Sequence, residues 1–164
     1  MKVLIVYYSR SGQTRNIAEV IAKKLGAELE EIVDHRNRKG LLGFFTSGNE
    51  AHLKKVIPIE RLKNEPAQYD LIIVGTPIWA GNLSTPIRSF LMEYRVQITK
   101  LAFYTICLGS DPQNVFLEAE EIVSQKPIAL MNISYRNIKK QNHLEMVDTF
   151  VKNIKQNLKE KRSI

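Results

Sequence analysis

The chain has 164 residues, of which 44% are hydrophobic and 25% are charged, and these proportions are typical of an ordinary globular domain. A chain of this length can bury a core of its own, so we expect a single domain over residues 1–164. No apolar run approaches the roughly 18 residues that a membrane-spanning helix needs. The single cysteine excludes an internal disulfide and favours a cytoplasmic location.

The formal net charge of +7 comes from basic residues that concentrate in three stretches, residues 35–39, 54–63 and 152–162. Charge runs of this kind usually belong to the solvated surface. The alternative is a surface that binds nucleic acid or an acidic partner protein. The sequence has no basic strand interleaved with aromatic residues and no zinc-finger spacing, so nucleic acid has the weaker support.

Five stretches of the chain are predicted to form β-strands, and they alternate with helical patterns. Residues 3–8, 71–75 and 101–108 are nearly continuous apolar runs, as expected of strands that are covered on both faces. Residues 27–33 and 128–134 carry more polar side chains, as strands at the edges of a sheet do. The alternation predicts an α/β fold with a five-stranded parallel, doubly wound sheet in the order 2-1-3-4-5.

The helical patterns have recognisable start and stop signals. Ser84 precedes a first-turn proline, and Asp111 stands in the same relation to the next helix, where we expect its side chain to act as a cap. Gly26 is expected to end the first helix. Apolar residues at three- and four-residue spacing from Leu144 to Leu158 predict a long final helix.

The stretch from residue 34 to residue 63 is the hardest to interpret. We expect the second helix here, beginning at about Asn49. Four apolar residues between positions 41 and 45 stand among glycines, and they would either pack this helix onto the sheet or form a flap over a cofactor or a contact between two copies.

Three loops are predicted to meet at one edge of the sheet, because ligands of doubly wound folds bind beyond the carboxyl ends of the strands where the winding reverses. These loops are residues 9–14, 76–86 and 109–113. The first, SRSGQT, offers three hydroxyl groups, a glycine that permits close approach, and the N–H groups that begin the following helix. It would bind an anion such as a phosphate, or it would only cap the helix. Arg10 and Arg15 would neutralise such an anion or face solvent.

The first loop lacks two other well-known phosphate-binding patterns. It has no Gly-Lys-Ser/Thr, which argues against phosphoryl transfer from a nucleoside triphosphate. It also lacks the G-x-G-x-x-G spacing of dinucleotide-binding folds. A mononucleotide is therefore the better match.

The second and third loops carry groups suited to a flat ring. Trp79, the only tryptophan, is expected in a loop just beyond a central strand, where it would stack on a ring such as an isoalloxazine or close the end of the core. The Ala80–Gly81 peptide is expected to be flexible and to hydrogen-bond an edge of that ring. Gly109 and Ser110 would supply backbone groups for its pyrimidine edge.

These motifs resemble those of the flavodoxin family. YYSRSGQT is similar to the family's phosphate loop, S/T-x-T-G-x-T, with Ser11 at the middle threonine, and GTPIWAGNLSTPIRSFL is similar to its second flavin loop and the helix that follows. The order of elements matches over nearly the whole chain. The resemblance implies a flavodoxin-like three-layer α/β/α sandwich, with FMN as the cofactor. It assigns the phosphate to Ser9, Arg10, Ser11, Gly12, Gln13 and Thr14, and the ring to Pro77, Ile78, Trp79, Ala80, Gly81, Leu108, Gly109 and Ser110.

Two departures separate this chain from electron-carrying flavodoxins. Those proteins usually place a tyrosine in the third loop, stacked on the outer face of the flavin, whereas GSDPQN contains no aromatic residue. They are also usually acidic around the flavin, whereas this chain is basic. A basic protein is expected to hold a less negative redox couple and to bind acidic partners.

Three functions stay open on this basis. The leading hypothesis is an FMN-binding protein that carries electrons to a partner protein. The second is an FMN-dependent NAD(P)H:quinone-type oxidoreductase, in which the more open ring face admits the hydride donor and the acceptor in turn. The third is a non-redox module that binds another phosphate ligand or none.

Other chemistries of doubly wound proteins lack their residues here. A low-molecular-weight tyrosine phosphatase needs Cys-x5-Arg after its first strand, whereas Cys107 lies on the fourth and is expected to be a buried apolar residue. A response-regulator receiver needs acidic residues where this chain has serines. His35, His52 and His143 have no metal-ligand spacing and are expected at the surface.

Overall fold

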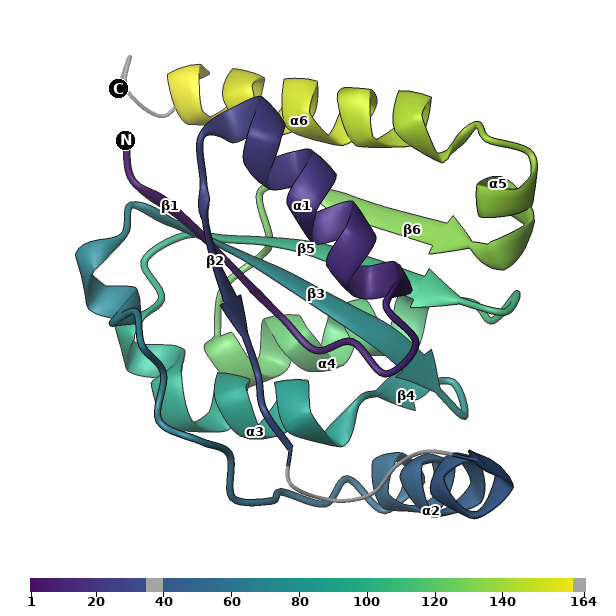
Figure 1. Ribbon diagram of the computed structural model, residues 1–164. Helices are drawn as coiled ribbons and strands as arrows, with labels where there is room; N and C mark the ends of the chain where they lie inside the picture. The colour runs from purple at the N-terminus through teal and green to yellow at the C-terminus, as the bar shows by residue number, and fades with distance from the viewer. Residues whose placement is uncertain (35–39, 161–164) are drawn as a thin grey trace.

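The computed structural model describes residues 1–34 and 40–160. Within these residues the chain forms a sheet with helices on both of its faces (Figure 1). The strands are β1 (Val3–Tyr7), β2 (Glu28–Glu31), β3 (Leu71–Trp79), β4 (Asn82–Leu83), β5 (Leu101–Cys107) and β6 (Leu130–Ser134). The α-helices are α1 (Gln13–Leu25), α2 (Gly40–His52), α3 (Thr85–Tyr94), α4 (Gln113–Val123), α5 (Tyr135–Lys139) and α6 (His143–Glu160), with short 3-10 turns at Pro66–Gln68 and Arg95–Gln97.

The sheet has the predicted parallel order. Its path is β2-β1-β3-β5-β6, which is the expected 2-1-3-4-5 once the two-residue β4 is set aside. In this register Ile5 of β1 lies beside Leu29 on one side and Ile73 on the other. The central strands are buried on both faces, which explains their unbroken apolar sequences.

Strand β4 was not predicted from the sequence; it pairs antiparallel with the end of β3 and forms a hairpin with it. β3 accordingly continues to Trp79, four residues beyond its expected end at 75, so the expectation of a loop around Trp79 was wrong. Ala80 and Gly81 link the two strands with φ angles of 48° and 74°. Two positive φ values are the mark of a tight two-residue hairpin turn, so Ala80 and Gly81 form the turn of this hairpin, and the flexibility expected of their peptide stays a prediction.

One expected helix boundary needs correction, and one short helix was not predicted. α2 begins at Gly40, not near Asn49, and ends at His52. The packing expected of the apolar side chains between positions 41 and 45 lies outside what the structure describes. The short helix α5 was not predicted; Ser134 and Asn137 start it with a capping box, in which the Asn137 N–H donates to Ser134 Oγ.

Two expected helix signals are confirmed. The Gln113 N–H donates to Asp111 Oδ1 at 3.0 Å, so this carboxylate caps the start of α4. Gly26 ends α1 in the left-handed conformation.

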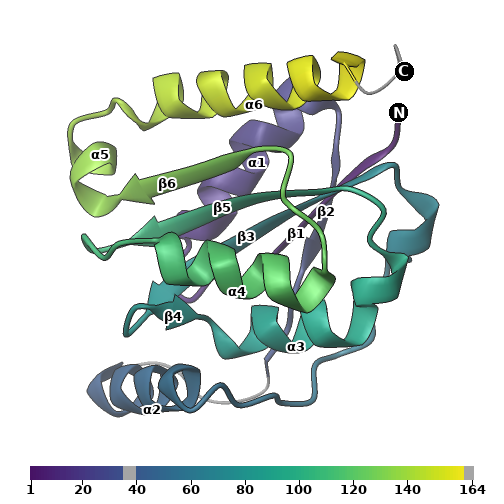
Figure 2. The ribbon, with the colours of Figure 1, turned by 180° about the vertical axis from the view of Figure 1, so that it is seen from behind.

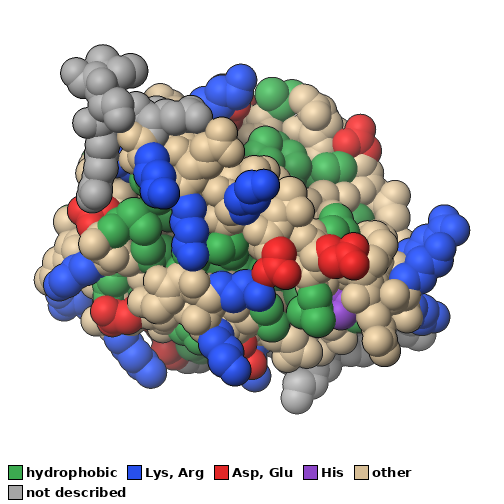
Figure 3. Space-filling view, turned by 90° about the horizontal axis from the view of Figure 1, so that it is seen from above, with side chains coloured by type: hydrophobic (Ala, Val, Ile, Leu, Met, Phe, Trp, Pro, Cys, Tyr) green, Lys and Arg blue, Asp and Glu red, His purple; other side chains and the backbone are tan. Residues whose placement is uncertain are grey.

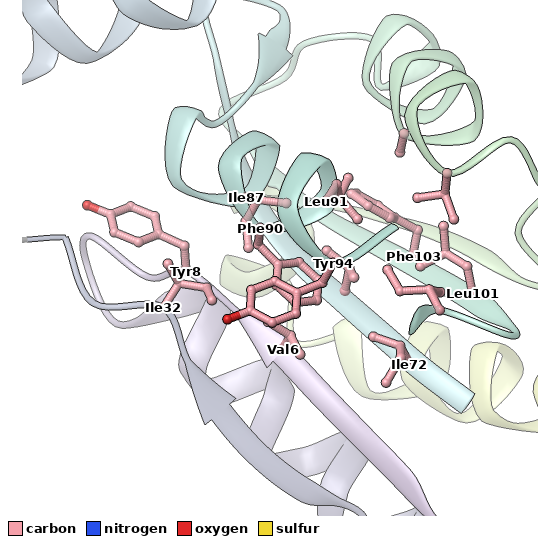
Figure 4. Packing of buried hydrophobic residues seen from close by; sticks show 14 of the residues in the cluster. Val6, Tyr8, Ile32, Ile72, Ile87, Phe90, Leu91, Tyr94, Leu101 and Phe103 are labelled. Carbon is pink, nitrogen blue, oxygen red and sulfur yellow. The ribbon is translucent and has the colours of Figure 1, made fainter. Parts of the chain in front are cut away.

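The core consists of two clusters, one on each face of the sheet. α1 and α6 cover one cluster, and α3 and α4 cover the other (Figures 1 and 2). On the α3 face, Phe90 and Leu91 pack with Phe103 of β5 (Figure 4). No helix among the described residues is long and apolar enough to cross a membrane.

Candidate functional site

The three predicted loops meet at the carboxyl edge of the sheet. They enclose a small cavity of about 80 Å³. Its lining comprises Arg10, Ser11 and Thr14 from the first loop, Pro77, Ile78 and Trp79 from β3, Ile106, Cys107 and Leu108 from the end of β5, and Tyr135 from α5. The parallel topology therefore brings together side chains from the ends of four strands.

The first loop presents backbone donors at the start of α1. Gly12 holds the N-cap position with φ of 88°, which favours glycine, and a Cβ added there would meet nothing within 4 Å. The N–H groups that begin a helix have no partners within it, so those of Gln13 and Thr14 point out of the α1 terminus. The open space at Gly12 and these donors suit an anion.

The three hydroxyl groups of this loop have different roles in the structure. Ser9 Oγ accepts a hydrogen bond from the Arg15 N–H at 3.3 Å, which is the capping role that the sequence left open. The Ser11 hydroxyl lies 2.9 Å from the Tyr135 hydroxyl. Thr14 is buried, and its carbonyl oxygen accepts a hydrogen bond from Tyr104 Oη at 2.9 Å. Capping therefore accounts for only one of the three hydroxyls.

The two arginines near the loop are placed differently. Arg10 lines the small cavity. Arg15 forms a bidentate ion pair with Glu31, with Nη2–Oε distances of 2.7 and 2.6 Å, and this hydrogen-bonded pairing raises the pKa of Arg15. Of the two arginines, Arg10 is the one that lines the cavity.

Tyr104 contacts the first loop from within the core. It is fully buried, and burial raises the pKa of its hydroxyl well above the usual value of 10.0, so it stays a hydrogen-bond donor. Its ring crosses over Gly75, where an added Cβ would lie 2.2 Å from the ring carbon Cζ. Gly75 therefore makes room for the ring that reaches Thr14.

Trp79 belongs to the core and to the site at once. Only 5% of it is exposed, and it meets the Tyr8 ring edge to face, with ring centroids 5.5 Å apart. It also lines the cavity beside the phosphate loop. Both roles that the sequence left open for this tryptophan are compatible with its position.

A second, larger cavity of about 550 Å³ lies next to the first, because Ile78, Trp79 and Leu108 line both. Ala80 and Ser110 complete the part of its lining that the sequence predicted. The remaining lining residues, Gly48, Asn49 and His52, come from α2. Figures 1 and 2 show α2 beyond α3, at the end of the molecule to which the strands point.

A buried ion pair holds the end of α2 in this place. Arg88 of α3 is 2% exposed and pairs with Glu118 of α4, with an Nε–Oε1 distance of 2.6 Å. Its Nη2 atom also donates to the carbonyl oxygen of Ala51 at 3.3 Å. Just beyond α2, the Ile57 N–H donates to Ser89 Oγ at 2.8 Å. Polar contacts from α3 thus fix where α2 stands.

Some predicted site residues lie in the three loops without lining either cavity. Among the described residues these are Ser9, Gly12, Gln13, Gly81 and Gly109. Ser9 and Gly12 shape the first loop, as described above. Gly109 has φ of 149°, a conformation that other residues rarely adopt.

Six residues that line the two cavities were not predicted as site residues: Gly48, Asn49, His52, Ile106, Cys107 and Tyr135. Tyr135 could have been suspected, because it directly follows the last strand at the same edge of the sheet. His52 was expected only as a surface residue; it is exposed, but it lines the larger cavity. Of the other histidines, His143 is half-buried and His35 lies outside the described residues.

Cys107 is buried, as predicted, at the end of β5. Its Sγ donates a hydrogen bond to Asn132 Oδ1 at 3.4 Å. Within residues 1–34 and 40–160, no group of three or more His, Cys, Asp and Glu residues is placed to hold a metal ion.

Comparisons with solved structures match this architecture. A flavoprotein from Lactobacillus acidophilus NCFM, solved in complex with FMN, is 25% identical with a TM-score of 0.68, over 85% of this chain and 97% of that chain. Oxidised Flavodoxin 2 from Bacillus cereus is 20% identical with a TM-score of 0.57, over 95% and 99% of the two chains. The Trp repressor binding protein from Bacillus subtilis is 12% identical with a TM-score of 0.59, over 91% and 98%.

These structures share the flavodoxin-like fold, and a family model that matches the sequence assigns this chain to a family. The family model described as flavodoxin matches residues 2–137, which include β1, β3, β5 and the three loops at their ends. The chain belongs to the flavodoxin family.

Proposed function

We propose that this protein is an FMN-dependent redox protein that transfers electrons to a small organic acceptor, as an NAD(P)H:quinone-type oxidoreductase does. The observation that carries this proposal is the pair of adjoining cavities, which share Ile78, Trp79 and Leu108. The smaller adjoins the phosphate loop, and the larger is wide enough for a small molecule.

The residues at the carboxyl edge fit FMN. The α1 terminus offers unbonded N–H groups and clear space at Gly12, which suit a terminal phosphate. Trp79 and Ile78 give the neighbouring space an apolar wall, which suits a flat ring. The flavodoxin family assignment and the FMN complex of the Lactobacillus relative support the same cofactor.

Within this proposal, the chain's own residues bind and orient the cofactor. Arg10, Ser11 and Thr14 hold the phosphate, and Tyr104 fixes the Thr14 carbonyl from inside the core. Trp79, Ile78 and Leu108 exclude water from the ring. FMN itself supplies the redox chemistry, accepting a hydride and releasing electrons.

Titrations with FMN and riboflavin test cofactor binding, because only FMN carries a phosphate. We expect FMN to bind the apo-protein tightly, with quenched flavin fluorescence, and riboflavin to bind weakly. Ser11→Ala should weaken FMN binding about tenfold, through loss of a hydrogen bond to a charged group, and leave riboflavin unaffected. Thr149→Ala removes a hydroxyl from α6 and serves as the control. Equal affinities for both flavins, or none for either, would refute the proposed site.

A second role, electron transfer to a partner protein, has one observation in its favour. The exposed side chains of Lys152, Lys155 and Lys159 follow one another along α6. Several Lys and Arg side chains, with a few acidic ones among them, are visible on the face shown in Figure 3. An acidic protein would be attracted to this surface. Steady-state oxidation of NADH or NADPH with a quinone separates the two roles: sustained turnover supports the oxidoreductase, and its absence supports the carrier. Location in the cytoplasm stays a prediction from the single cysteine.

A further inference from the structure

The larger cavity has a wall that the cofactor motifs do not account for. Asn49 and His52 are exposed residues of α2, and both line this cavity. They are three positions apart, so they share one side of the helix. The same cavity is lined by the apolar side chains of Ile78, Trp79 and Leu108.

This α2 wall is held in place on more than one side. Ala51, between the two polar residues, is fully buried, and its carbonyl oxygen is bound by the buried Arg88. Gly48 directly precedes Asn49, and a Cβ added to it would lie 3.6 Å from Cβ of Ala80, so α2 lies against the β3–β4 hairpin. A helix held in this way can present polar side chains to a small molecule in an otherwise apolar cavity.

The donor groups on this wall indicate what kind of molecule it takes. An imidazole N–H and a carboxamide N–H both donate to carbonyl oxygens. The third loop, residues 109–113, has no aromatic side chain to fill the space. We propose that the α2 wall binds the electron acceptor, a planar quinone, with His52 and Asn49 donating hydrogen bonds to its carbonyl oxygens. This inference rests on the proposed function.

The reaction balances with the groups named. Reduction of the quinone to a quinol takes two electrons and two protons, of which bound FMN would supply the two electrons and one proton as a hydride. A second proton reaches the carbonyl oxygen through the imidazole of His52, which recovers it from water. NADH or NADPH then reduces the FMN again. The product is the quinol.

Binding of menadione, a naphthoquinone, to the oxidised FMN-loaded protein tests the inference without turnover. FMN affinity is measured first for each variant, and calorimetry then gives the dissociation constant for menadione. We expect His52→Gln and Asn49→Ala each to weaken menadione binding about tenfold, as loss of one hydrogen bond predicts, and to leave FMN affinity within twofold of wild type. His143→Gln, the same kind of change on α6, should alter neither constant.

The results separate this inference from the function on which it rests. Absence of FMN binding to the wild-type protein would refute the proposed function. If FMN binds but menadione does not, or if His52→Gln and Asn49→Ala bind menadione as wild type does, the α2 wall is not the acceptor site. If both variants lose FMN affinity instead, these residues contact the cofactor, and the inference is likewise wrong.

Discussion

The two faces of the sheet are stabilised by different interactions. The cluster under α1 and α6 includes the buried Tyr104, whose hydroxyl donates to the Thr14 carbonyl. The face under α3 and α4 buries the Arg88–Glu118 ion pair among its apolar side chains. It also buries the Thr76 and Ser84 hydroxyls, which lie 2.7 Å apart. Apolar packing is non-directional, whereas these polar contacts specify positions, including that of α2.

Glu118→Leu should produce the largest effect, because it leaves the Arg88 guanidinium buried without a counter-charge. Loss of one partner of a buried ion pair lowers the free energy of unfolding by about 3–5 kcal/mol. Urea denaturation followed by far-ultraviolet circular dichroism measures this change.

The double variant Arg88→Met/Glu118→Leu is the control for that prediction. It removes both charges and keeps similar volumes, so most of the lost stability should return. If the double variant is as unstable as Glu118→Leu, the buried charge is not the cause.

Gly75→Ala should be the next most severe change, and it acts on the face under α1 and α6. The new Cβ would lie 2.2 Å from the Tyr104 ring, which is locked in the core and cannot move aside. Overpacking of this kind lowers the free energy of unfolding by about 3 kcal/mol. Gly48→Ala is the matched control, since its Cβ meets only Ala80 at 3.6 Å and helix propensity favours alanine by up to about 1 kcal/mol. Equal losses in both variants would contradict the steric explanation.

Tyr104→Phe should have a smaller effect that depends on pH. Loss of the hydrogen bond to the Thr14 carbonyl lowers the free energy of unfolding by about 1 kcal/mol near neutral pH. Because burial raises the pKa of Tyr104 above that of the unfolded chain, its contribution is complete below about pH 10 and decreases as the pH rises further. As the pH rises from about 9 to about 11, the range in which tyrosine titrates, the variant should therefore lose less stability than wild type. Parallel pH curves would exclude this coupling.

Tyr135→Phe should give the smallest effect. It removes the hydroxyl that lies 2.9 Å from the Ser11 hydroxyl, so the phosphate loop loses one orienting contact. We expect FMN affinity to fall by a factor of about 3, with riboflavin affinity unchanged, which corresponds to about 0.5–1 kcal/mol. Tyr69→Phe, whose hydroxyl contacts Asn64, is the control. A similar loss for both flavins would show that Tyr135 acts on the ring or on the fold.

The sheet could be predicted because the apolar runs of β1, β3 and β5 leave no other interpretation. The β3–β4 hairpin could not, because Ala80 adopts a left-handed conformation that its side chain does not favour. α2 was misplaced because its sequence, GLLGFFTSGNEAH, contains three glycines and a Thr-Ser pair, which disfavour helix. Contacts with Arg88 and Ala80, distant in sequence, help to hold it.

The site likewise has parts that a local sequence pattern predicts and parts that depend on contacts between distant residues. The place of the first loop at the cavity could be predicted, since its residues are consecutive and follow a recognisable strand. Tyr135 and His52 could not, because each reaches the site from an element whose position depends on the whole fold. No local pattern marks His52, and only its place on α2 brings it to the cavity.

The contact between Ser11 and Tyr135 spans 124 residues, and this separation bears on the synthesis of the protein. The ribosome makes the phosphate loop first, whereas β3 ends at Trp79 and Tyr135 follows much later. A nascent chain that ends before Tyr135 contains the loop but not all of the residues that line the cavity beside it. We expect the proposed FMN site to be complete only after Tyr135 has been synthesised, so a part of the site that is made early reaches its final form late.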